Sequence, residues 1–208
     1  MGIFASVRTR EQSGESCMKL TRILSALGAT LFLAACAVSP QEVAIEPSSG
    51  EEFPSADRSG MVVNLSVNDR RSSTDLGTLG GTYDESAKLT ASNDIAADLR
   101  ALLTTKLENA GYTVSSSNAD FTMRVNLNTL RYERETGTVS SEVRVVSELD
   151  LRLEDARGYL ERSYRSAQNQ TRVTRPTADN NREFLEEVLN SSVDRLIRDE
   201  RVHTFLRR

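Results

Sequence analysis

Val143-Arg-Val-Val-Ser-Glu-Leu-Asp-Leu-Arg-Leu-Glu154 is the stretch that decides the fold of this 208-residue chain. Apolar side chains occupy one set of alternate positions and mostly charged side chains occupy the other. This alternation is typical of a β-strand that has one buried face and one face in water. The apolar set is Val139, Val143, Val145, Leu149, Leu151 and Leu153, and the charged set is Glu142, Arg144, Glu148, Asp150, Arg152 and Glu154.

Two neighbouring segments extend this strand into a meander. Residues 121–127 alternate in the same way and predict the strand before it, while Gly137 and Gly158 mark the turns on either side. Residues 159–173 form the third strand, but their alternation is poor and they are rich in Arg, Gln and Asn. Poor alternation of this kind favours the edge of a sheet.

The rest of the chain supplies the helices that cover the apolar face. We expect a strand at 61–67, a helix at 92–110, a short strand at 112–114 and a second helix from 179 onward. The order β-α-β-β-β-α predicts an α+β fold, in which two helices pack on one face of an antiparallel sheet of about four to five strands. Residues 61–208 would form this single domain.

Three short signals set the expected limits of these elements. Ser92 and Asp179 are plausible N-caps for the two helices, and Gly111 is placed to end the first helix. Residues 77–82, Gly-Thr-Leu-Gly-Gly-Thr, lack the spacing of a phosphate-binding motif and predict a flexible loop.

The N-terminal part reads as a secretory leader. An apolar run of about 13 residues, 23–35, follows Lys19 and Arg22 and is too short to span a bilayer. Leu33-Ala34-Ala35-Cys36 closes the run and resembles the lipobox of bacterial lipoproteins. That resemblance implies a signal peptide at 1–35, cleavage before Cys36, and acyl chains such as palmitate on Cys36. Met18 is the expected true start of translation.

Residues 36–60 contain several Pro, Ser and Glu residues and are expected to form a flexible linker behind the lipidated cysteine. Ala37 follows Cys36, at the position where lipoproteins of the inner membrane tend to carry Asp. The lipobox resemblance therefore implies the outer membrane, with the domain facing the periplasm.

The composition excludes several classes of function. The net charge of −4 argues against a nucleic-acid partner. His203 is the only histidine, and the leader and the lipid would consume both cysteines, so neither a metal site nor a cofactor is expected. Arginines interleave with Glu142, Glu148 and Asp150, which indicates cross-strand ion pairs rather than catalysis. We expect a protein that is not an enzyme.

Aromatic and basic side chains in the meander form a candidate contact surface for protein or glycan, although core packing of the tyrosine rings is the alternative. Its members are Tyr132, Tyr159, Arg162, Tyr164 and Arg165. The edge strand near 165–172 is also a candidate for self-association into a homo-oligomer.

Taken together, five segments resemble the YajG family of bacterial lipoproteins. The segments are Leu-Ala-Ala-Cys36, Met61-Val-Val-Asn-Leu-Ser-Val-Asn-Asp69, Asp98-Leu-Arg-Ala-Leu-Leu103 running on to Ala110-Gly111-Tyr112, Val125-Asn-Leu-Asn-Thr-Leu130, and Val202-His203-Thr204-Phe205-Leu206. The resemblance implies an outer-membrane lipoprotein and carries over no catalytic residue.

Three functions follow as hypotheses. The favoured one is a non-catalytic binding or scaffolding module, tethered by its lipid, for envelope proteins or peptidoglycan. The alternative is an accessory in outer-membrane lipid or lipopolysaccharide transport, which requires an apolar groove. A cell-wall hydrolase acting through Glu148, Asp150 or His203 is the third.

Overall fold

The computed structural model describes residues 39–56, 60–80 and 87–207. The expected signal peptide, the lipobox Leu33-Ala34-Ala35 and Cys36 lie outside these residues. The described residues form an α+β domain with one sheet of eight strands and three helices.

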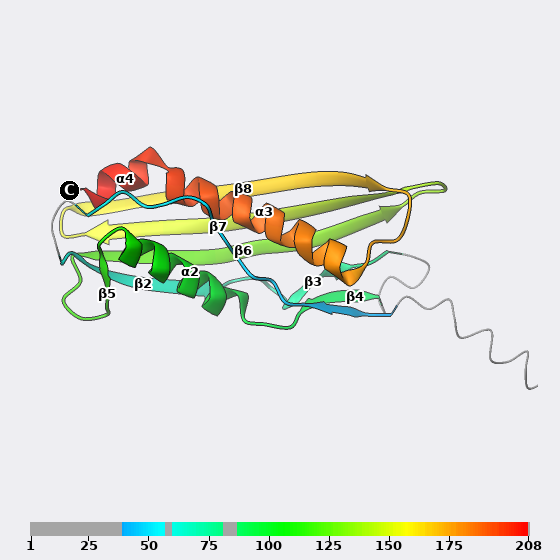
Figure 1. Ribbon diagram of the computed structural model, residues 1–208, viewed down its shortest axis with the longest axis horizontal. Helices are drawn as coiled ribbons and strands as arrows, with labels where there is room; N and C mark the ends of the chain where they lie inside the picture. The colour runs from blue at the N-terminus through cyan, green and yellow to red at the C-terminus, as the bar shows by residue number, and fades with distance from the viewer. Residues whose placement is uncertain (1–38, 57–59, 81–86, 208) are drawn as a thin grey trace, which may run out of the picture. The chain divides into compact units, whose positions relative to one another are not determined.

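The predicted meander forms one side of the sheet (Figure 1). Strands β6 (Phe121–Thr136), β7 (Ser141–Asp155) and β8 (Gly158–Arg172) pair antiparallel in sequence order. Within the described chain β8 pairs only with β7, which confirms the predicted edge strand. Self-association through that edge stays a prediction.

The other edge of β6 carries two strands placed end to end. Strand β2 (Val62–Asp69) runs parallel to the first half of β6, and β3 (Asp75–Thr78) pairs with the second half, also parallel. Three short strands complete the sheet: β5 (Thr113–Val114) beside β2, β4 (Lys88–Ala91) beside β3, and β1 (Gln41–Val43) beside β4.

The prediction of a purely antiparallel sheet of four to five strands is therefore wrong in size and in direction. Strands β1, β3 and β4 have three or four residues each. Segments this short carry too few alternating positions to stand out in a sequence. Residues 77 and 78 of the expected flexible loop instead belong to β3, where Gly77 lies opposite Tyr132 of β6.

A β-bulge at Asn128 explains why the alternation of β6 changes phase. Leu127 pairs with Leu149, but Thr129 pairs with Glu148, so Asn128 is the extra residue. Before the bulge the odd-numbered side chains are buried, and after it Leu130 and Tyr132 are buried instead. The bulge keeps both halves of this long strand in register with β7.

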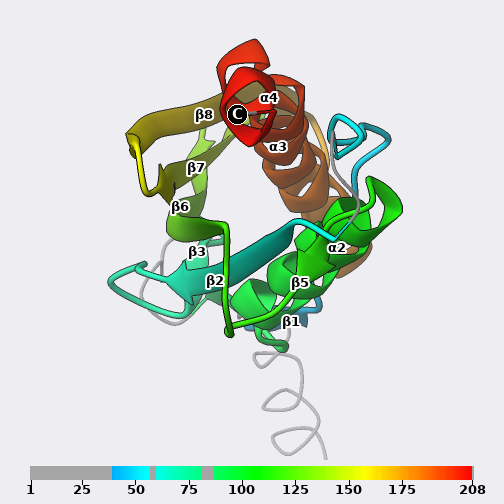
Figure 2. The same ribbon diagram turned by 90° about the vertical axis from the view of Figure 1, so that its left-hand side faces the viewer.

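Helices α2 (Ile95–Asn109), α3 (Ala178–Arg198) and α4 (Glu200–Leu206) lie on one face of the sheet, which curves around α2 and α3 (Figure 2). The predicted N-caps were each off by two residues. Asp94 rather than Ser92 caps α2, and Thr177 rather than Asp179 caps α3, where Thr177 and Asn180 form a reciprocal capping box.

The apolar stripe predicted for the last helix is confirmed, because each of its members is at most 4% exposed. The members are Phe184, Leu185, Val188, Leu189, Val193, Leu196 and Ile197. They pack against the buried side chains of β6 and β7 in one continuous core. Phe205 of α4 closes one end of that core against Phe121, with ring centroids 6.2 Å apart.

Residues 39–56, which we name the strap, are not a flexible linker. Val43, Ile45 and Phe53 are at most 4% exposed and belong to the core. Asn93 holds the Ile45 backbone from both sides: its Oδ1 accepts from the Ile45 N–H at 2.9 Å and its Nδ2 donates to the Ile45 carbonyl at 2.8 Å. Three apolar residues among Pro, Ser and Glu were enough to dock the segment.

Side chains of α3 form hydrogen bonds with other groups of the strap. Asn190 accepts from the Ser48 N–H at 2.8 Å, Glu186 accepts from the Glu46 N–H at 3.1 Å, and Asn181 donates to the Gln41 side chain at 2.8 Å. The domain thus includes the strap, and its first described residues lie well before the expected boundary at residue 61.

Candidate functional site

One face of the sheet carries no helix in the part of the chain that the structure describes (Figure 2). Val143, Val145, Leu149, Leu151 and Leu153 of β7 point to the helices, so the alternate positions point the other way. We name this the open face, and it is defined by Arg124, Asn126, Glu148, Asp150, Arg152, Glu161, Ser163 and Arg165.

A cleft of about 500 Å³ lies on the open face. Two rows of cross-strand neighbours line the cleft. In the first row Arg124 of β6 pairs with Arg152 of β7, and in the second Asn126 of β6 pairs with Asp150 of β7. Glu161 and Ser163 continue these rows on β8. Arg70, just beyond β2, also lines the cleft.

Arg152 is the fixed cation of this cleft. Its Nη1 lies 2.6 Å from the Glu161 carboxylate and its Nε lies 3.2 Å from Glu154. Its guanidinium also stacks over the Tyr159 ring, 4.6 Å from the centroid. The hydrogen bond that Arg152 donates to Glu161, followed by the one it donates to Glu154, raises the pKa of Arg152 above its ordinary value.

Arg124 lies directly opposite Arg152, and like charges at such positions repel each other. Glu161 and Glu154 offset this repulsion around Arg152. Among the described residues, no carboxylate lies within ion-pair distance of Arg124 or Arg70. A guanidinium beside a cleft that has no carboxylate within ion-pair distance is suited to bind a carboxylate or phosphate group with two hydrogen bonds.

A second cleft, of about 320 Å³, lies at the bulge between β3 and β6. Its charges pair with each other or with neighbours: Lys88 with Asp75 at 2.7 Å, and Arg71 with Asp69 at 2.6 Å. Burial alone would raise the pKa of Asp69, but the hydrogen bonds from Arg71 outweigh it and lower that pKa. This cleft is therefore the weaker candidate for binding an anion.

The predicted contact surface does not exist as a single surface. Tyr132 and Tyr164 are 1% and 7% exposed, so the alternative of core packing holds for both rings. Burial raises the pKa of Tyr132 to about 12. Arg162 also points to the helix side, where its Nε lies 3.3 Å from Asp199. Only Tyr159 and Arg165 lie on the open face.

Asp199 joins β8 to the two C-terminal helices. It caps α4 by accepting from the Arg201 N–H, and it accepts from the Tyr164 hydroxyl at 2.9 Å. Burial would raise the pKa of Asp199, but these hydrogen bonds and that from Arg162 outweigh it and hold the pKa below its ordinary value. Burial and the bond to Asp199 together raise the pKa of Tyr164.

Replacing this carboxylate tests the junction. Asp199→Ala should lower the free energy of unfolding by about 2 to 3 kcal/mol, because a helix cap and two further hydrogen bonds are lost. Denaturant unfolding followed by circular dichroism measures the change, and Tyr164→Phe, which removes one of the bonds, should cost about 1 kcal/mol.

The pH dependence gives the same junction a second readout. The folded pKa of Asp199 lies below the unfolded one, so its contribution is complete above about pH 4 and is lost as the pH falls through the folded pKa. The loss of stability below pH 4 should therefore be smaller in Asp199→Ala than in the unchanged protein. Equal acid sensitivity would contradict this role.

The residues considered for hydrolysis do not meet. Asp150 and Glu148 lie on the open face, and Asp150 accepts a hydrogen bond from Asn128. His203 lies in α4 on the other side of the sheet, where its Nε2 is 2.5 Å from the Ile197 carbonyl oxygen. The predicted cross-strand ion pairing is present at Arg152 and Glu161.

The described residues contain no group of three or more His, Cys, Asp or Glu side chains arranged to hold a metal ion. None of the helices in the described ranges has the length and hydropathy that crossing a bilayer requires.

The sequence belongs to a family of lipoproteins. A family model, Lipoprotein_16, described as an uncharacterized lipoprotein, matches residues 54–207. The chain is therefore a member of that family, and membership implies a membrane-anchored protein of the cell envelope. No curated protein matches the chain.

Several solved structures are similar to this one at low sequence identity. Protein XCC0632 from Xanthomonas campestris is 12% identical, with a TM-score of 0.43 over 81% of this chain and 99% of that one. A putative neuraminyllactose-binding hemagglutinin homolog from Helicobacter pylori is 14% identical, with a TM-score of 0.44 over 78% and 95%. A minor lipoprotein from Acinetobacter baumannii is 15% identical, with a TM-score of 0.39 over 69% and 93%.

Proposed function

We propose that this lipoprotein is a non-catalytic binding module, held at the outer membrane by a lipid on Cys36, that presents its open face to an envelope protein or to peptidoglycan in the periplasm. The observation that carries the proposal is the cleft at Arg124 and Arg70, where two guanidinium groups that pair with no carboxylate of the described residues border a sheet face that no described helix covers. The ligand class that fits is a carboxylate-bearing chain, either an acidic protein segment or the peptide stems of the cell wall.

The transport alternative requires an apolar groove, and the described residues support it less than they support a binding module. Core side chains fill the space between helices and sheet, since Leu99, Leu149 and Leu189 are fully buried. The two clefts described above are bordered largely by polar and charged side chains. Hydrolysis also finds no support, because the acid and histidine side chains lie on opposite sides of the sheet.

Photo-crosslinking in cells tests the proposal. A photo-crosslinking amino acid placed at Ser163, inside the cleft, should give one reproducible adduct with an envelope protein or with peptidoglycan. The same amino acid at Arg100, an exposed position of α2, is the matched control and should give none. Adducts of equal pattern from both positions would contradict a specific role for the open face.

Arg124→Glu should reduce the yield of that adduct by about tenfold, because a charge-assisted pair is worth more than about 1.4 kcal/mol. Arg144→Glu makes the same charge change on the same face but outside the cleft, and should leave the yield unchanged. Thermal unfolding of both variants verifies that the fold is kept. An unchanged yield in Arg124→Glu would remove the cleft from the binding site.

A further inference from the structure

The strand register shows at which end of the domain β1, the first described strand, begins. Gln41 pairs with Leu89, Leu89 with Gly77, and Gly77 with Tyr132, so these four residues lie at one level of the sheet. Strand β1 is antiparallel to β6, because β1 is parallel to β4 and β4 is antiparallel to β3. Strand β1 therefore begins at the end of the domain toward which β6 continues beyond Tyr132.

That direction leads to the turn between β6 and β7, which projects beyond the start of α3 (Figure 1). We name residues 136–140 and 172–175 the tip. They belong together because Ser141 pairs with Arg172, and the Gly137 N–H donates to the Ser140 carbonyl at 2.9 Å to close the turn.

The tip carries two of the three large apolar side chains that are strongly exposed among the described residues. Val139 is 81% exposed and Val173 is 79% exposed. The third, Tyr159, lies on β8 at the other end of the meander, opposite Glu154, and stacks on Arg152. Two exposed valines give this end of the domain apolar surface, which is suited to contact with an interfacial partner.

The length of the chain decides which partner reaches the tip. Four residues separate Cys36 from Gln41, and these five residue-to-residue steps span at most about 18 Å. Thr136 lies four residues beyond Tyr132, about 13 Å along the strand, and the turn extends further. A lipid on Cys36 would thus hold the bilayer surface within reach of the tip, since the strap leaves no long spacer.

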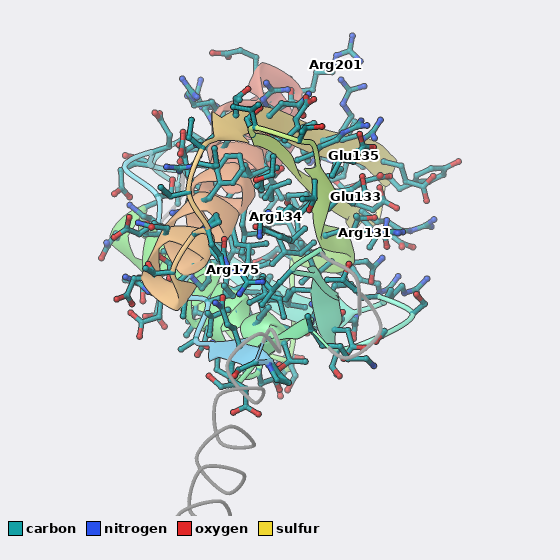
Figure 3. All side chains as sticks on the ribbon, turned by 90° about the vertical axis from the view of Figure 1, so that its right-hand side faces the viewer. Arg131, Glu133, Arg134, Glu135, Arg175 and Arg201 are labelled. Carbon is teal, nitrogen blue, oxygen red and sulfur yellow. The ribbon has the colours of Figure 1, made fainter. Side chains whose placement is uncertain are left out.

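We propose that the tip docks on the surface of the bilayer that anchors Cys36, with Val139 and Val173 inserted at the boundary between the lipid headgroups and the acyl chains. This inference rests on the proposed lipid attachment. Apolar contact is its main driving force, because charges of both signs lie near the tip: Glu135, Arg134 and Arg175, which Figure 3 labels, and Glu142 and Arg172, which are close to them along the strands. The open face then stands to the side of the membrane rather than against it.

A depth measurement tests the docking. The processed lipoprotein carrying Val139→Cys is labelled with an environment-sensitive fluorophore and reconstituted in vesicles of phosphatidylethanolamine and phosphatidylglycerol. Lipids brominated in their acyl chains should quench the fluorophore about twofold. Tyr159→Cys, an exposed position at the other end of the strands, is the matched control and should not be quenched.

Each outcome separates the two proposals. If neither labelled protein floats with the vesicles, lipid attachment fails and the docking falls with it. If both float and the label at residue 139 remains open to aqueous iodide, the anchor stands and the docking is wrong. If that label is protected from iodide but not quenched by brominated lipid, a second copy of the chain covers the tip, and this also overturns the docking.

Discussion

Gly77→Ala should lower the free energy of unfolding by at least about 4 kcal/mol and detach β3 from β6. A Cβ atom at Gly77 would lie 1.8 Å from the carbonyl oxygen of Tyr132, and its backbone has a φ of +151°. The contact atom belongs to the backbone of a paired strand, so no side-chain rotation relieves it. Chemical denaturation followed by circular dichroism measures the loss.

Gly158→Ala separates backbone strain from the clash. Gly158 has nearly the same φ, +156°, but nothing lies within 4 Å of its Cβ position. The strain alone should cost about 2 kcal/mol. Equal effects of the two substitutions would show that the approach of β3 to β6 is looser than the structure has it.

Phe53→Ala should lower the free energy of unfolding by about 3 to 4 kcal/mol, which is the cost of emptying a well-packed aromatic site. Phe53 is 4% exposed and belongs to the strap, the segment whose composition indicated a linker. In a linker the same substitution would have no measurable effect on unfolding, so thermal and denaturant melts decide between the two descriptions.

Glu42→Ala provides the control within the same segment. Glu42 is exposed in β1, and its loss should change the free energy of unfolding by less than about 0.5 kcal/mol. If the Phe53→Ala and Glu42→Ala proteins unfold at the same temperature and denaturant concentration, the packing of the strap into the core is contradicted and the strap is a linker.

The long elements of this fold were predictable because each one repeats its pattern several times. Strand β7 carries five apolar positions at a period of two and the last helix carries seven at helical spacing, so local sequence and burial agree. The two helix caps were misplaced by two residues because Ser92 and Asp179 are as good in composition as Asp94 and Thr177. Only the φ and ψ values of the flanking residues distinguish them.

The strands missed in the sequence are held by distant partners rather than by local pattern. β1 exists because β4 and α3 offer backbone and amide partners to it, and β3 exists because Gly77 allows a close approach to Tyr132. The candidate site was missed for a related reason. Arg124 was visible as a polar position, but its placement opposite Arg152 follows from the register of two strands, which no local signal contains.

The strap also has a consequence for the order in which the domain assembles. Ser48 and Asn190 are 142 positions apart, and Asn181 reaches back 140 positions to Gln41. A ribosome makes the strap among the first segments of the domain, but the helix that holds it is among the last. We therefore expect the growing polypeptide to stay open until its final helix emerges, and an open polypeptide is the form in which a chain can be threaded through a translocation pore.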